Sequence, residues 1–78
     1  MKPVNDSPVE VDFNNRDEDG AVRLHLPVTQ SDLEQLHIAL AEGQCLWVTD
    51  NEVEMTGRVT LRDGIWVLVP DKGGEREL

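Results

Sequence analysis

The sequence predicts a small α+β domain with the element order ββαβββ. Three observations lead to this prediction. Two short runs near the beginning alternate apolar and polar residues, residues 30–42 show helical apolar spacing, and three more strand-like runs follow. One helix and five antiparallel strands are expected to form a sheet packed against the helix, or a sheet curled into a small, partly open barrel.

The first two predicted strands are VEVDF, residues 9–13, and VRLHL, residues 22–26. Side chains alternate between the two faces of a strand, so the apolar residues of each run share one face. The inward residues are Val9, Val11, Phe13, Val22, Leu24 and Leu26. The stretch NNRDEDGA joins the two runs, and we expect a hairpin with a long acidic loop.

The predicted helix follows Pro27, which ends the second strand, and runs from about residue 30 to 42. Thr29 suits the N-cap and Gly43 suits the C′ position. Three leucines at helical spacing should face the sheet: Leu33, Leu36 and Leu40. Ile38 falls nearly opposite that stripe, so it should be exposed to solvent or covered by something else.

The last three predicted strands form a meander. If the Asp-Asn pair at 50–51 and the Asp-Gly pair at 63–64 are both two-residue turns, the register follows. The expected facing pairs are Val48 with Val53, Leu46 with Met55, Leu61 with Trp66 and Val59 with Leu68. These residues would form the core face. Gly57, in the middle of the strand 52–62, favours a bend or bulge and hence the barrel.

Length bounds the organisation of the chain, because 78 residues allow one domain at most. Residues 1–8 are polar, contain two prolines and should be a disordered lead. Residues 71–78 are polar and contain glycines, so they should be a flexible tail. Residues 9–70 would then form a single α+β domain. The one cysteine excludes an intramolecular disulfide.

Sixteen acidic and seven basic residues give a formal net charge of −9. A field of this sign repels phosphate, which disfavours direct nucleic-acid binding and adhesion to anionic membranes. It favours basic protein partners, although such a charge also serves solubility alone. The N-terminus lacks the apolar core of a signal peptide, and no apolar run approaches the roughly 20 residues that span a bilayer. A cytoplasmic protein is expected.

Residues capable of catalysis are few. His25 is expected to point outward and form a surface ion pair, and a general base would also need a pocket beside it. His37 borders the helix stripe, and neither histidine has a second metal ligand at helical spacing. Cys45 should lie near carboxylates, which raise rather than lower a thiol pKa. The sequence predicts no catalytic site and no cofactor, so we do not expect an enzyme.

The acidic loop invites comparison with a calcium loop. Asn15, Asp17 and Asp19 followed by Gly20 resemble the first half of the EF-hand pattern. The twelfth position is Leu26, where a bidentate glutamate is required, and the flanking elements are strands instead of helices. A solvated turn is expected, with at most a weak cation site.

Two surfaces are candidates for binding a partner. Tryptophan, arginine and branched apolar residues share the sheet face opposite the predicted core: Trp47, Arg58, Arg62, Ile65, Val67 and Val69. Either the first two strands fold over this face or another molecule covers it. The second surface is acidic and adjoins Ile38, with carboxylates from the loop and the helix: Asp17, Glu18, Asp19, Glu34 and Glu42.

These features favour a small, acidic, non-enzymatic protein–protein interaction module, such as an adaptor, an inhibitor or an antitoxin-like regulator. Its acidic surface could mimic the charge of a nucleic acid toward a basic partner. One alternative is a structural auxiliary subunit or homodimer. A further alternative is a weak metal-binding or small-ligand module that uses His25 and the acidic loop.

Overall fold

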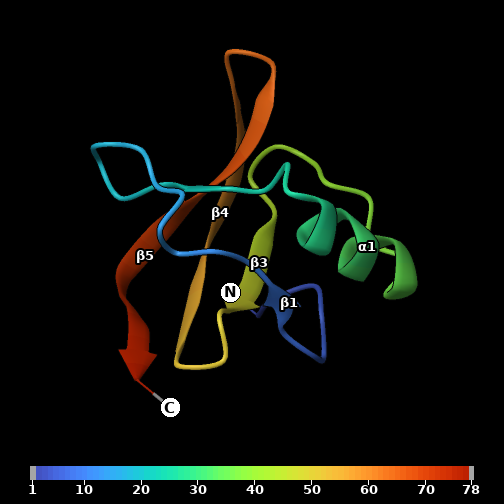
Figure 1. Ribbon diagram of the computed structural model, residues 1–78, viewed down its shortest axis with the longest axis horizontal. Helices are drawn as coiled ribbons and strands as arrows, with labels where there is room; N and C mark the ends of the chain where they lie inside the picture. Colours follow the sequence, from blue (N-terminus) through green and yellow to red (C-terminus); the bar gives the residue numbers. More distant parts are fainter. Residues whose placement is uncertain (1, 78) are drawn as a thin grey trace.

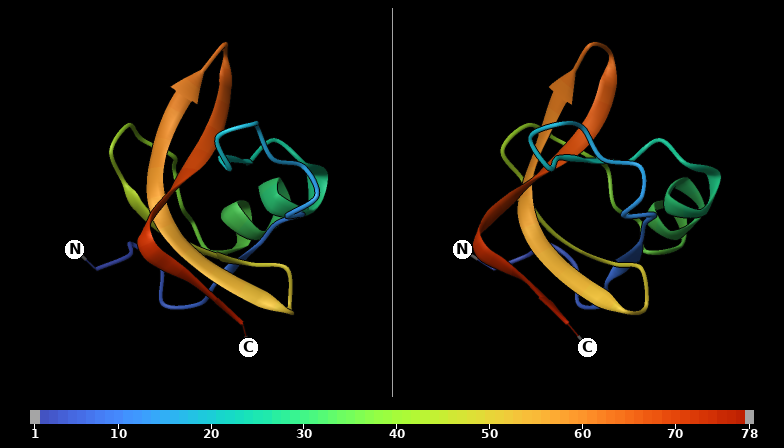
Figure 2. Two further views of the ribbon diagram at one scale, coloured as in Figure 1. Left: turned by 90° about the vertical axis from the view of Figure 1, so that its left-hand side faces the viewer. Right: turned by 60° about the vertical axis from the view of Figure 1, so that its left-hand side comes forward.

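The structure, a computed structural model that describes residues 2–77, is an α+β fold with the predicted element order. A five-stranded mixed sheet has the strand order β1-β3-β4-β5-β2 and curls into a half-barrel (Figure 1). The elements are β1 (Val9–Glu10), β2 (Val22–Arg23), α1 (Pro27–Gln35), β3 (Cys45–Thr49), β4 (Val53–Arg62) and β5 (Ile65–Glu77). Figure 2 shows β4 and β5 curving together, with α1 on the inner side of the curve.

The predicted hairpin of the first two strands is wrong. β1 pairs in parallel with β3, with Val9 opposite Val48, whereas β2 pairs antiparallel with β5, with Val22 opposite Leu68. The two short strands therefore occupy opposite edges of the sheet, and the sheet is mixed instead of antiparallel. The expected inward face still holds for both strands, because side-chain alternation does not depend on which strand is the neighbour.

The helix begins earlier and ends earlier than predicted. Pro27 occupies its first turn, where a missing N–H costs nothing, and Leu26 precedes it without a side-chain cap. The Thr29 hydroxyl does not cap the helix but donates to the Glu10 carbonyl at 2.8 Å, which ties α1 to β1. Within residues 2–77, no helix is long and apolar enough to cross a membrane.

A Schellman motif ends the helix at a residue other than Gly43. His37 adopts a left-handed conformation with φ 57°, and its N–H donates to the Glu34 carbonyl at 3.1 Å. The Ile38 N–H donates to the Leu33 carbonyl at 2.9 Å. This turn reverses the chain, so that Ile38 packs against the core and is not exposed on a longer helix.

The register of β4 and β5 is as predicted, with Leu61 opposite Trp66 and Val59 opposite Leu68. The register of β3 and β4 differs by two residues, since Val48 lies opposite Met55. The cause is a longer turn in which the Asp50 side chain accepts hydrogen bonds from two backbone N–H groups. These bonds lower the pKa of Asp50. A shift of two preserves the faces, since side chains alternate with period two.

The strand β5 extends seven residues beyond the predicted end of the domain. After Pro70 pairs with Gly57, residues 71–74 loop out, and Glu75 then pairs with Met55. The predicted boundary at residue 70 is therefore wrong, and residues 75–77 belong to the sheet. Leu78 lies outside the described residues.

The N-terminal segment also contacts the sheet, contrary to the expected disordered lead. Val4 donates its N–H to the Cys45 carbonyl at 2.9 Å. The Asn5 side chain donates to the Trp47 carbonyl at 2.7 Å and accepts from the Trp47 N–H at 3.1 Å. These bonds continue the edge of β3 that β1 covers only in part. Met1 lies outside the described residues.

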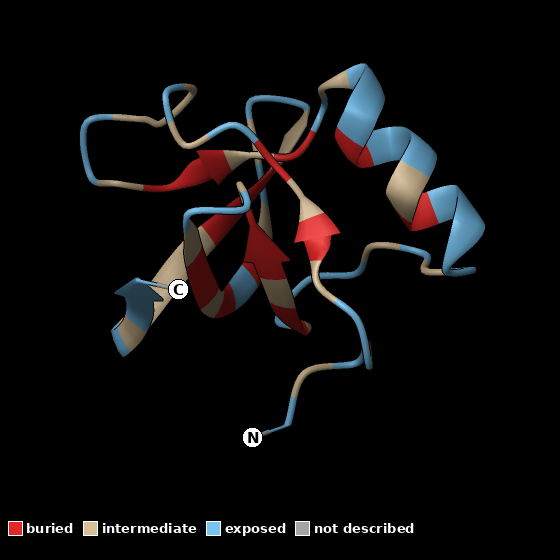
Figure 3. Cartoon of the chain, turned by 60° about the horizontal axis from the view of Figure 1, so that its bottom comes forward, coloured by how far each residue is buried: buried red, intermediate tan, exposed pale blue. Residues whose placement is uncertain are grey.

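The core fills the space between the concave sheet face and α1, as the buried segments in Figure 3 show. Its fully or nearly fully buried members are Val9, Val11, Val22, Leu24, Leu33, Leu46, Val48, Met55, Val59 and Leu68. Two leucines expected in the core or on the inner helix stripe are exposed instead, Leu61 at 52% and Leu36 at 38%. Leu61 lies near the tip of the β4–β5 hairpin, and Leu36 follows the last helical residue, where the core no longer covers them.

Candidate functional site

A cleft of about 440 Å³ lies where α1 and the segment after it meet β5. It is lined by Gln30, Leu33, Glu34, Ile38, Leu40 and Trp66, and we call it the α1–β5 cleft. Ile38, Leu40 and Trp66 are only partly buried, although they pack against the core. The left-handed turn at His37 places Ile38 here, and the sequence did not predict that turn because histidine rarely occupies it.

One carboxylate lines the α1–β5 cleft, and one exposed leucine is the ladder neighbour of its tryptophan. Glu34 lines the cleft and is exposed. Leu61 lies beside it, opposite Trp66 in the ladder. The Glu42 carboxylate accepts hydrogen bonds from the Thr60 hydroxyl at 2.9 Å and the Leu61 N–H at 3.3 Å, which holds Glu42 next to Leu61. Partly buried apolar side chains therefore lie beside the Glu34 carboxylate in this cleft.

The acidic loop, residues 15–20, lies over the outer side of the sheet. Asp17 forms ion pairs with Arg23 of β2 at 3.0 Å and with Arg62 of β4 at 2.9 Å. Because β2 and β4 flank β5, a carboxylate that reaches both arginines must cross β5. Asp19 adds a second pair to Arg62 at 3.1 Å, while Glu18 is exposed. We call residues 15–20 the acidic strap.

Ion pairing changes the acidity of the strap. Hydrogen bonds from Arg62 and Arg23 hold the pKa of Asp17 below its ordinary value of 3.8. The Arg62 guanidinium and the Ala21 N–H lower the pKa of Asp19 in the same way. The two carboxylates in turn raise the pKa of Arg62. Two of the five acidic residues predicted to face a partner are therefore already neutralised within the chain.

The lowered pKa values predict a pH dependence of stability. Both carboxylates have a lower pKa folded than unfolded, so their stabilising contribution is complete above the ordinary value of 3.8 and is lost as the pH falls through the lower folded values. We therefore expect Arg62→Gln to be less stable than the wild type at neutral pH. The difference in the free energy of unfolding between the two proteins should become smaller as the pH falls to about 2.5. Urea denaturation at each pH would measure it.

The control for this prediction is Arg58→Gln. Arg58 and Asp71 form a loose ion pair, with Nε and Oδ1 3.9 Å apart, and both side chains are well exposed. This pair should therefore contribute little to the free energy of unfolding at any pH. If the wild type were more stable than Arg62→Gln by the same free energy at every pH, the ion pairs of Arg62 with the acidic strap would not be the source of that stability.

The predicted apolar strip on the outer sheet face is not continuous. Val67 is 2% exposed, and it lies in the stretch of β5 that the acidic strap crosses. Ile65 and Val69 are half-buried on either side of it. The first two strands do not fold over this face, because β2 pairs beside β5 in the sheet; it is the acidic strap that crosses the middle of β5 near Val67. These acids were expected in solvent because Arg62, which pairs with both Asp17 and Asp19, is more than 40 residues away in the chain.

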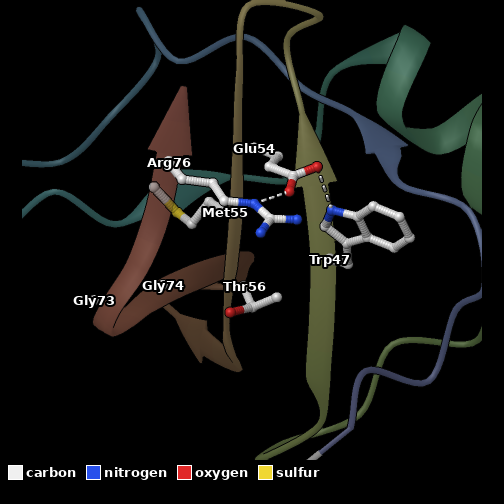
Figure 4. A pocket seen from close by; sticks show the side chains of 7 residues that line it. All are labelled: Trp47, Glu54, Met55, Thr56, Gly73, Gly74 and Arg76. Carbon is white, nitrogen blue, oxygen red and sulfur yellow. Dashed lines mark hydrogen bonds and ion pairs between the residues drawn. The ribbon is translucent and has the colours of Figure 1, made fainter. Parts of the chain in front are cut away.

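Trp47 lies in a separate hollow of about 400 Å³, shown in Figure 4. Its indole N–H donates to Oε2 of Glu54 at 3.2 Å, and Nε of Arg76 donates to Oε1 of the same carboxylate. Met55, Thr56, Gly73 and Gly74 complete the lining. We call this hollow the Trp47–Glu54 pocket. Neither Glu54 nor Arg76 was expected at a site, because Glu54 occupies an outward polar position of its strand and Arg76 falls in a polar, glycine-containing stretch.

The residues considered for chemistry lie apart from one another. His25 and His37 are exposed, and Cys45 is buried under the outer sheet face. Within residues 2–77, no group of three or more histidine, cysteine or carboxylate side chains is arranged to hold a metal ion. The carboxylates that resembled a calcium loop are the ones that bind Arg23 and Arg62.

Comparisons with protein-family models, curated proteins and solved structures found no match to this chain. Function must therefore be inferred from the residues themselves.

Proposed function

We propose that this chain is a small non-enzymatic protein–protein interaction module that seats a basic partner in the α1–β5 cleft. The observation that carries the proposal is that Ile38, Leu40 and Trp66 are only partly buried in the cleft, next to Leu61, which is 52% exposed. Apolar and aromatic residues that are partly open to solvent are typical of interface centres. Two of the predicted contact residues, Glu34 and Ile38, line this cleft.

The charge of the described residues determines the chemistry of the partner. Each of the five arginines is paired with a carboxylate of the same chain: Arg16, Arg23, Arg58, Arg62 and Arg76. Among residues 2–77, no arginine or lysine forms an ion pair with Glu34. The surface that remains is strongly acidic, so it favours a partner with basic residues around an apolar anchor.

The mutation Glu34→Lys should weaken partner capture. It places a cation at the rim of the cleft, where a basic partner would be repelled, and we expect the amount of partner captured from the source cell to fall by about tenfold. Quantitative mass spectrometry of proteins retained on the immobilised full chain would measure this. Binding by the wild type should also weaken as salt rises, because exposed charge pairs are screened.

Glu18→Lys is the matched control, since Glu18 is equally exposed but lies on the acidic strap, and it makes the same change in net charge. Its capture should equal that of the wild type. If Glu34→Lys and Glu18→Lys reduced the amount of captured partner equally, only net charge would matter, and the cleft would not be the binding surface.

A homodimer is the second candidate, and the exposed Val28, Leu36 and Leu61 favour it. Sedimentation at micromolar concentration distinguishes it, because a dimer through the cleft would be disrupted by Leu61→Asp. A nucleic-acid charge mimic that uses the acidic strap is less favoured, since Asp17 and Asp19 already bind arginines. The ion pairs of the strap likewise leave little to support a metal-binding or small-ligand module.

A further inference from the structure

The Trp47–Glu54 pocket joins a buried anion to an exposed cation. The Glu54 side chain is 9% exposed, whereas the Arg76 side chain that pairs with it is 76% exposed. A carboxylate this deeply buried needs hydrogen-bond donors and an opposite charge, because isolated burial would be costly. The Trp47 indole supplies one donor. The other must come from a guanidinium or a similar cation, and in this chain Arg76 provides it (Figure 4).

The segment that carries Arg76 is only loosely part of β5. Residues 71–74 loop out opposite Thr56 alone, and Gly73 has a φ of 73°, so glycines separate residues 75–77 from the rest of the strand. In the sheet these last three residues pair with residues 53–55 of β4, all three are exposed, and the one further tie is the ion pair between Glu75 and Arg16 among the described residues. A short terminal pairing with little burial opens at low free energy.

We propose that the Trp47–Glu54 pocket is a binding site for an arginine side chain on an extended segment of a partner protein, and that Arg76 is its built-in occupant. Opening residues 75–77 exposes the backbone of residues 53–55, to which an extended segment can add as a strand. The arginine of that segment replaces Arg76 on Glu54, beside the indole of Trp47. The exchange is feasible because Arg76 is already mostly hydrated, and because Glu54 is paired with a guanidinium both before and after it.

This site is separate from the α1–β5 cleft, and it does not depend on the function proposed for the cleft. The two share only the acidic field of the chain, which attracts a segment that carries arginine. The residues that line the Trp47–Glu54 pocket and those that line the cleft do not overlap.

The test uses the full chain and a synthetic peptide, acetyl-Gly-Gly-Glu-Arg-Glu-Leu-amide, which copies the built-in occupant. The Trp47 indole N–H resonance is followed by NMR as peptide is added. Arg76→Ala should bind the peptide at least about tenfold more tightly than the wild type, because the competing arginine is gone. The same peptide with citrulline, which is neutral, should bind at least about tenfold more weakly.

Glu54→Gln in the Arg76→Ala background should abolish binding, whereas Glu52→Gln, which changes an exposed carboxylate nearby, should leave it intact. If Arg76→Ala loses its native amide spectrum, Arg76→Lys serves instead, with an expected affinity between those of wild type and alanine. Equal binding of the citrulline peptide, binding that survives Glu54→Gln, or no binding to a folded Arg76 variant would overturn the proposal. A wild-type dimer that dissociates on Arg76→Ala would also overturn the proposal, because Arg76 of a second copy of the chain would then occupy the Trp47–Glu54 pocket.

Discussion

Gly57→Ala is expected to destabilise the fold more than any other change of a single methyl group considered for this chain. A Cβ atom at residue 57 would overlap the backbone carbonyl of Val69 and touch the Leu68 side chain, so β4 and β5 would have to separate. Backbone cannot move aside as a flexible side chain can, and we expect a loss of about 3 to 5 kcal/mol. Thermal denaturation should show a fall in Tm of about 15 °C.

Gly20→Ala is the control for this prediction. Gly20 has a φ of 86°, and no atom lies within 4 Å of the position of an added Cβ. The substitution would therefore destabilise the fold through backbone strain alone. We expect a loss of about 1 kcal/mol. If Gly57→Ala cost no more than Gly20→Ala, the close approach of the two strands at the bulge would be wrong.

Leu68→Ala is expected to have the second largest effect. Leu68 is fully buried between Val59 of β4 and Val22 of β2. Its truncation removes apolar contacts and leaves a cavity, which should lower the free energy of unfolding by about 2 to 5 kcal/mol. Urea denaturation followed by tryptophan fluorescence would measure the loss, which is a large share of the stability of a domain this small.

Leu61→Ala provides the matched comparison, because it removes the same atoms from the same hairpin. Alternation places both leucines on one sheet face, yet Leu61 is 52% exposed. Its truncation should cost less than about 1 kcal/mol. Similar losses at the two positions would mean that the hairpin tip is covered, either by the core or by a second copy of the chain.

Short-range pattern was sufficient to predict much of the sheet. The Asp-Gly pair at 63–64 determined the β4–β5 register, since a two-residue turn aligns its flanking strands directly. The turn after β3 misled the prediction because the Asp50 side chain satisfies two backbone donors and so supports a longer turn. The pattern carried no sign of this, as Asp begins turns of several lengths.

The candidate sites were much less predictable than the strands. Glu34 and Ile38 line the cleft together with Trp66, and Ile38 reaches this position only through the left-handed turn at His37. Arg76 was assigned to a tail because a glycine-containing polar stretch normally indicates mobility. Its pairing with Glu54 joins residues 22 positions apart and appears only once β5 returns to β4.

By itself, the amino-acid sequence determined the order of the elements, the alternation of faces and the acidic field, because each depends on neighbouring residues or on composition. Only the tertiary structure decided which strands pair and which carboxylates form ion pairs with arginines. Those outcomes depend on contacts between residues far apart in the chain, such as Val9 with Val48 and Asp17 with Arg62. The alternation of apolar and polar residues does not predict such contacts. A strand with a given alternation can pair with any strand edge that its connections allow it to reach.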